Sequence, residues 1–115
     1  MYPSLTYHDI GAALAWLNRA FGFDGQYLDD VAAVVRFRDR TTLIQLDRPD
    51  ELHGSHIGQG WVYVVVDDID AHYQRAKIAG ATLLGEPHDY GDGHQGYSAR
   101  DLEGNLWSFG TGPVP

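Results

Sequence analysis

The chain repeats one helical pattern at a distance of about half its length, and this repeat limits the folds that it can adopt. Between Asp9 and Gly22, apolar residues recur three or four positions apart, as on one face of a helix. Asp is a preferred helix N-cap, and Gly is preferred just after the last helical turn. The same frame spans Asp67 or Asp68 to Gly80, and 67 − 9 gives an offset of 58 in 115 residues. We therefore predict two similar modules with one helix in each, at Ile10–Phe21 and Ile69–Ala79.

Each helical pattern is preceded by one pattern typical of a strand and followed by three. β-Branched and aromatic residues mark these segments, and Gly, Asp and Asn mark the turns between them. In the first half we expect strands at Leu5–Tyr7, Gly25–Leu28, Val31–Arg38 and Thr41–Leu46. In the second half we expect strands at Trp61–Val66, Thr82–Leu84, Gly96–Arg100 and Leu106–Phe109. This order predicts an α+β fold of two tandem βαβββ modules.

The two modules are expected to share one core. A single βαβββ module has one helix and one sheet face, which is too little apolar surface to bury alone. We therefore predict one domain over residues 1–115, with the first module at about 1–50 and the second at about 59–115. The segment 47–60 is rich in Asp, His and Gly and joins the modules as a crossing linker.

The composition narrows the class of protein and of ligand. Sixteen acidic against eight basic residues give a net charge of −8, which disfavours nucleic acid and anionic membranes and favours a cationic ligand, although acidity can serve solubility alone. The absence of cysteine excludes thiol nucleophiles and cysteine-based zinc sites.

The longest apolar run, Trp61–Val66, is far shorter than the ~20 residues of a membrane span, and the N-terminus lacks the layout of a signal peptide. We expect a cytoplasmic protein.

Three segments resemble the vicinal oxygen chelate superfamily, which includes glyoxalase I, extradiol dioxygenases, fosfomycin-resistance transferases and bleomycin-resistance proteins. They are 9–23, 63–81 and 97–110, the last with the turn Asp101-Leu-Glu-Gly-Asn105. The resemblance implies that the two modules form a cup-shaped, partly open mixed sheet. It does not settle function, since the superfamily supports many chemistries.

The resemblance also implies four positions at which catalytic members hold a divalent metal. Counted from the helix caps and from the turn glycine, these positions fall at Tyr2, about Gln45, about Gln59 and Ser108. One phenol, two amides and one hydroxyl do not match the usual ligands of such an ion. We therefore expect no metal, no cofactor and no catalytic residue. A metal-dependent lyase, isomerase or dioxygenase remains the alternative.

The histidines and the paired acids offer a competing interpretation. His53 and His56 have a spacing that some metal sites use, and His88 and His94 also fall in segments rich in Gly and Asp. We expect these four to be surface loop residues, while a metal ligand or a ligand-contacting histidine among them stays open. The pair Asp67-Asp68 is expected to cap the second helix rather than act as a base.

Strand alternation predicts which side chains line the cup. If position 59 points inward, so do Trp61 and Tyr63, whereas Trp107 and Phe109 point towards the helices. The alternative is that these aromatic residues simply fill the core. The predicted ligand-binding residues are Phe37, Gln45, Gln59, Trp61, Tyr63, Ser98 and Ser108.

An aromatic cup without metal ligands resembles the bleomycin-resistance branch of the superfamily. Members of that branch are acidic homodimers that bind a cationic, partly planar antibiotic in grooves made by both subunits, without chemistry. The resemblance therefore implies a metal-free, homodimeric protein that binds a cationic aromatic antibiotic or metabolite.

Overall fold

The computed structural model describes residues 3–38, 40–48, 54–58, 60–91 and 93–112. The first module has the order β1 Ser4–Tyr7, α1 Ile10–Phe21, β2 Asp24–Tyr27, β3 Ala32–Phe37 and β4 Arg40–Leu46. The second has the order β5 Trp61–Val65, α2 Ile69–Ile78, β6 Thr82–Leu83, β7 His88–Gly91, β8 His94–Arg100 and β9 Leu106–Gly110. The predicted βαβββ order is confirmed in both halves, and β7 is an additional strand.

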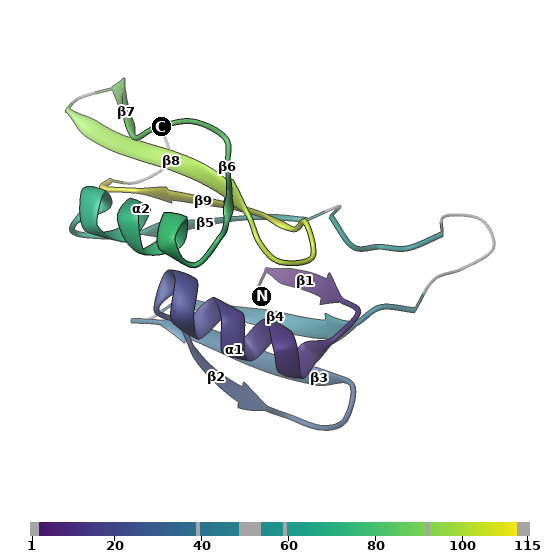
Figure 1. Cartoon of the computed structure of the whole chain (residues 1–115). Coiled ribbons are helices and arrows are strands. Elements are labelled where there is room, and N and C mark those ends of the chain that lie inside the picture. The colour runs from purple at the N-terminus through teal and green to yellow at the C-terminus, as the bar shows by residue number, and fades with distance from the viewer. Residues whose placement is uncertain (1–2, 39, 49–53, 59, 92, 113–115) are drawn as a thin grey trace.

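The two modules have the same sheet topology. The strand orders are β1-β4-β3-β2 and β5-β9-β8-β6, and in each sheet the first strand runs parallel to the last while the other pairs are antiparallel. Figure 1 shows the two sheets one above the other, with one helix lying on each. The predicted α+β fold with open, mixed pairing is confirmed, in the form of two sheets.

Strand β7 pairs with β8 outside this shared order. Its sequence, His-Asp-Tyr-Gly, has no alternation of apolar and polar residues, and its register shifts between Asp89 and Gly91. Backbone hydrogen bonds at the sheet edge therefore hold this strand, and side-chain patterning could not predict it.

The two helices begin at the same kind of cap. The side chain of Asp9 accepts a hydrogen bond from the Ala12 amide, and that of Asp68 accepts one from the Ala71 amide. Asp68 is thus the N-cap of α2, and the second of the two candidate acids is the correct one. Helix α1 ends at Phe21 and is followed by the C-cap Gly22, whose φ of 78° is left-handed, as predicted for this glycine.

The core is continuous across the two modules. The ring of Phe21 on α1 lies 4.7 Å from the ring of Phe109 and 5.8 Å from that of Trp107, both on β9. Phe23 of the first module also contacts Trp107, with 5.0 Å between ring centroids. Because neither module buries its aromatic residues alone, this shared core supports the proposal that the chain is one domain.

The turn between β8 and β9 joins the second module to β1. The buried carboxylate of Asp101 accepts hydrogen bonds from the Tyr7 hydroxyl, the Trp107 indole and the backbone amides of Glu103 and Asn105. Burial raises the pKa of Asp101, and these four hydrogen bonds oppose that rise. The Glu103 carboxylate accepts from the amides that precede α1, at 2.5 and 2.9 Å. In Figure 1 this turn reaches down to β1 between the two sheets.

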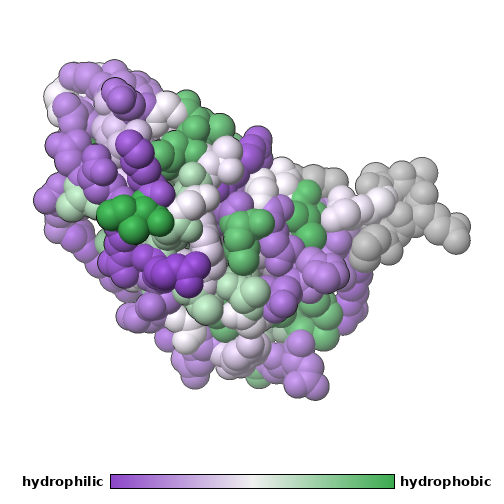
Figure 2. Space-filling view, in the orientation of Figure 1, coloured by the Kyte–Doolittle hydropathy of each residue, from purple (hydrophilic) through white to green (hydrophobic). Residues whose placement is uncertain are grey.

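The helix-covered side of the molecule is mostly polar. Figure 2 shows patches of apolar side chains separated by polar ones on this side. Among the described residues, no helix is long and apolar enough to cross a membrane.

Candidate functional site

The side chains of β5 and β9 alternate as predicted. Val62 and Val64 are buried beneath the helices, while Trp61 is 56% exposed on the opposite face of the sheet. On β9, Trp107 and Phe109 are fully buried against the helices. The aromatic residues on one face of the sheet therefore fill the core, and those on the other face remain accessible to a ligand. Each of the two interpretations, core filling and ligand binding, holds for one face.

The accessible face of the second sheet contains a hollow of about 240 Å³. We call it the aromatic pocket. The four predicted residues Trp61, Tyr63, Ser98 and Ser108 lie together here. The remaining lining residues are His88, Tyr90, Gly96, Tyr97 and Phe109.

A hydrogen-bond network fixes the floor of the aromatic pocket. The Trp61 indole Nε1 donates to Ser108 Oγ at 2.8 Å, and Ser108 Oγ lies 2.6 Å from Ser98 Oγ. Ser98 and Ser108 meet because they are directly paired residues on the antiparallel strands β8 and β9. Trp61 is thereby held with its ring exposed and its polar atom occupied.

Two tyrosines form one wall of the pocket. The hydroxyls of Tyr63 and Tyr90 form a hydrogen bond of 2.6 Å, and the carbonyl oxygen of Gly112 lies within hydrogen-bond distance of both and accepts from this pair. Burial raises the pKa of Tyr63, so its hydroxyl stays neutral at physiological pH. A Cβ at Gly110 would lie 2.1 Å from the Tyr63 hydroxyl, so only glycine leaves room for this ring. Sequence reasoning missed Tyr90 because it lies on the unpredicted strand β7.

The residues at the implied metal positions do not fit a divalent ion. The third of these positions moves from about Gln59 to Trp61, because the N-cap of α2 is Asp68. Trp61 is the seventh residue before that cap, as Tyr2 is the seventh residue before the N-cap Asp9. An indole N–H can only donate, and the Ser108 hydroxyl is engaged with Trp61 and Ser98. Among the described residues, no group of three or more His, Asp or Glu side chains could hold a metal ion.

The other predicted site residues lie elsewhere. Gln45 on β4 lines a separate hollow in the first module. The Phe37 ring contacts the rings of Phe23 and His72, at 5.9 and 6.4 Å between centroids, and does not line the aromatic pocket. Gln59 and Tyr2 lie outside the described residues.

The histidines differ in part from expectation. His88 and His94 lie on β7 and β8, so the prediction that they are loop residues was wrong; the missed strand β7 is the reason for His88. His72 is a buried residue of α2, hydrogen-bonded to the Tyr97 hydroxyl and the Phe21 carbonyl. His53 lies outside the described residues.

The chain matches the family model of the glyoxalase/bleomycin resistance protein/dioxygenase superfamily over residues 2–109. It belongs to this family. None of the curated proteins is similar enough in sequence to count as a match.

Solved structures agree with this assignment. TioX from Micromonospora sp. ML1 is 30% identical, with a TM-score of 0.80 over 100% of this chain and 97% of that chain. A glyoxalase/bleomycin resistance protein from Catenulispora acidiphila DSM 44928 is 26% identical, with a TM-score of 0.73 over 98% and 97% of the two chains. A family enzyme from Burkholderia phytofirmans PsJN is 17% identical, with a TM-score of 0.72 over 95% and 94%, and supports the fold alone.

Proposed function

We propose that this family member is a metal-free binding protein that holds a cationic, aromatic small molecule, an antibiotic or a metabolite, in the aromatic pocket. The observation that carries the proposal is the network in which the Trp61 indole and the Ser98 hydroxyl occupy the hydroxyl of Ser108. At the position where catalytic members of the family hold a metal, this chain has an aromatic ring and its hydrogen-bonding partners.

The chemistry of the pocket suits a planar ligand with a positive charge. Trp61 offers a stacking surface, and Tyr63 and Tyr90 offer a second aromatic wall whose hydroxyls face each other. A cation over an aromatic ring gains about 0.5–2 kcal/mol, and stacking contributes on a similar scale. The net charge of −8 attracts a cation to the protein at long range.

The lining residues favour binding without reaction. Those that the structure describes include no Asp, Glu, Lys or Arg. His88 is the one lining residue that could act as a general base, and its Nδ1 lies 3.3 Å from the Glu86 carbonyl oxygen. The Ser108 hydroxyl contacts an indole and another hydroxyl instead, so within the described part of the chain no base activates it as a nucleophile. Sequestration of the ligand is therefore the activity that we propose.

We further propose that the protein is a homodimer and that it is cytoplasmic, as the resemblance and the sequence implied. Trp61 is 56% exposed, which supports the dimer because a second subunit could cover the open side of the aromatic pocket and complete a groove around the ligand.

A thermal-shift screen tests the proposal. Cationic glycopeptide, peptide and aromatic antibiotics are added to the protein with and without EDTA, and separately with Zn²⁺, Ni²⁺, Fe²⁺ or Mn²⁺. We expect an aromatic cation to raise the melting temperature equally with and without EDTA. Stabilisation that requires a divalent metal would indicate a metal-dependent enzyme instead.

A further inference from the structure

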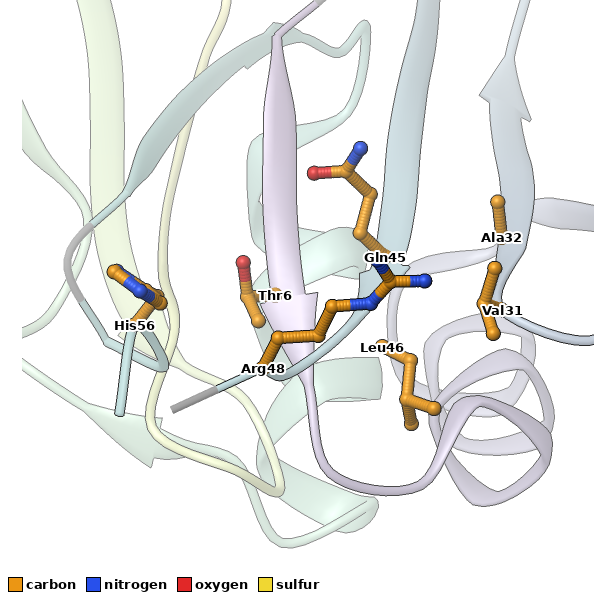
Figure 3. A pocket seen from close by; sticks show the side chains of 7 residues that line it. All are labelled: Thr6, Val31, Ala32, Gln45, Leu46, Arg48 and His56. Atoms are coloured by element: carbon orange, nitrogen blue, oxygen red, sulfur yellow. The ribbon is translucent and has the colours of Figure 1, made fainter. Parts of the chain in front are cut away.

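A groove lies between the two helices, on the side of the molecule away from the open faces of the sheets (Figure 1). Its volume is about 590 Å³. It shares no lining residue with the aromatic pocket or with the hollow around Gln45 that Figure 3 shows. We call it the helix groove, and its lining residues are Arg19, Ala71, Gln74, Arg75, Ile78 and Ala79.

Hydrogen bonds between the helices fix the shape of the helix groove. The Arg75 guanidinium donates from Nε to the Arg19 carbonyl oxygen and from Nη2 to the Asn18 carbonyl oxygen, each at 2.9 Å. The Trp16 indole donates to the Ala79 carbonyl oxygen at 3.1 Å. These bonds hold the C-terminal halves of α1 and α2 together, so the groove is formed before any partner binds.

One stripe of α2 forms the floor of the groove. Four lining residues recur three or four positions apart: Ala71, Gln74, Arg75 and Ile78. Such a stripe lies on one face of a helix and is about 10 Å long. Ile78 is 86% exposed, more than any other large apolar residue that the structure describes. Figure 2 shows an apolar patch on α2 with strongly hydrophilic residues beside it. The floor therefore combines an apolar contact with charged neighbours.

The two helices are basic, whereas the whole chain is acidic. They carry three basic residues, Arg19, Arg75 and Lys77, against the single acid Asp70, while the chain has a net charge of −8. In the part of the chain that the structure describes, none of these three basic residues forms an ion pair. Arg75 uses Nε and Nη2 on α1 and keeps Nη1 for another acceptor. Two guanidinium groups in the groove are therefore available to carboxylates.

We propose that the helix groove binds an acidic amphipathic helix of a partner protein. A helix that lies in a groove between two others buries its apolar stripe there and presents polar side chains at the borders. Apolar side chains of the partner contact Ile78 and Ala71, and its carboxylates pair with Arg19 and Arg75. The small side chains of Ala71 and Ala79 let the partner helix approach closely.

Charge favours this occupant over the alternatives. A second copy of this chain would bring helices with the same excess of basic residues, so like charges would meet. An anionic membrane is disfavoured by the net charge of −8. The helix groove lies away from the aromatic pocket, so this proposal does not depend on the ligand proposed there.

The test uses a synthetic peptide of about 15 residues, long enough to form a helix, with leucine on one face and glutamate on the others. In one control peptide glutamine replaces every glutamate, and in a second the same residues are scrambled so that no apolar face remains. In titrations of ¹⁵N-labelled protein, we expect the glutamate peptide to shift the amide resonances of Ala71, Gln74 and Ile78 in a saturable way. Both control peptides should bind at least fivefold more weakly.

Three variants separate the helix groove from the general charge of the protein. Arg19→Gln and Ile78→Ser should each weaken binding of the glutamate peptide at least fivefold. Arg36→Gln should leave it unchanged, because Arg36 is an exposed arginine on β3 outside the groove. Arg75 is not replaced, because it also holds the end of α1. Urea unfolding should show all three variants to be as stable as the wild type.

Several results would each overturn the proposal. They are equal binding of the glutamate and glutamine peptides, an equal loss in Arg36→Gln, no loss in Arg19→Gln, and shifts centred on Ser98 and Ser108. A dimer that Arg19→Gln or Ile78→Ser dissociates in sedimentation would assign the groove to a contact between copies of this chain. Binding to phosphatidylglycerol vesicles without binding of the peptide would assign it to a membrane surface.

Discussion

His72 should make the stability of the protein depend on pH between about 6.5 and 4. The side chain is 9% exposed, with Nδ1 2.5 Å from the Tyr97 hydroxyl and Nε2 3.2 Å from the Phe21 carbonyl oxygen. A carbonyl can only accept, so Nε2 carries the hydrogen and Nδ1 accepts from Tyr97. Burial, with a smaller contribution from the charge of Arg75, lowers the pKa of His72 to about 4 from 6.5.

The sign of the effect follows from the two pKa values. Below pH 6.5 the unfolded chain takes up a proton at His72 while the folded protein does not, so the free energy of unfolding falls as the pH falls. The loss is complete once the pH is below about 4, where both states are protonated. The difference between the two pKa values corresponds to about 3 kcal/mol, a large part of the stability of a domain of this size.

Urea unfolding at pH 7, 6, 5 and 4.5 measures this loss in the wild type and in His72→Gln. Glutamine can keep both hydrogen bonds, since its amide donates and its oxygen accepts, but it does not titrate. The carboxylates contribute equally to both proteins, so the difference between the two profiles isolates His72. We expect this difference to change by about 2–3 kcal/mol over the range. Parallel profiles, or a His72 imidazole that titrates near 6.5 by NMR, would show that burial of His72 does not cause the pH dependence.

Three further predictions concern the joint, the metal and the assembly. Asp101→Asn puts an amide among four hydrogen-bond donors, so unfolding in urea should show a loss of about 2–3 kcal/mol, while Asp70→Asn on the exposed side of α2 should change little. Elemental analysis should find no stoichiometric divalent ion in purified protein, and about one zinc, iron, nickel or manganese per chain, lost on Ser108→Ala, would contradict this. Sedimentation at micromolar concentration should show a dimer, and monomer alone would count against it.

The fold could be predicted because its determinants are local and repeated. The Asp caps, the C-terminal glycine of α1 and the alternation in Trp61–Val65 each specify one element, and both modules use the same order. The first residue of α2 could not be predicted with the same precision, because Asp67 and Asp68 are chemically equal candidates for its N-cap. Only the backbone geometry distinguishes them, since Asp68 accepts from the Ala71 amide.

The site could be predicted only where it rests on strand parity. Trp61, Tyr63, Ser98 and Ser108 lie together because their strands pair in a fixed register. Tyr90 could not be found, because β7 is an edge strand held by backbone hydrogen bonds. Parity also could not separate Gln45 from these residues, because parity gives the face of a strand and not the sheet on which a hollow lies.

Calorimetry on an aromatic cation from the thermal-shift screen shows directly whether Trp61 holds the ligand. The wild type is compared with Trp61→Ala and with Tyr27→Ala, in which the lost ring is equally exposed but lies outside the aromatic pocket, at 56% and 57%. We expect Trp61→Ala to weaken binding about tenfold or more and Tyr27→Ala to have no effect. Equal affinity of the wild type and Trp61→Ala would contradict this expectation.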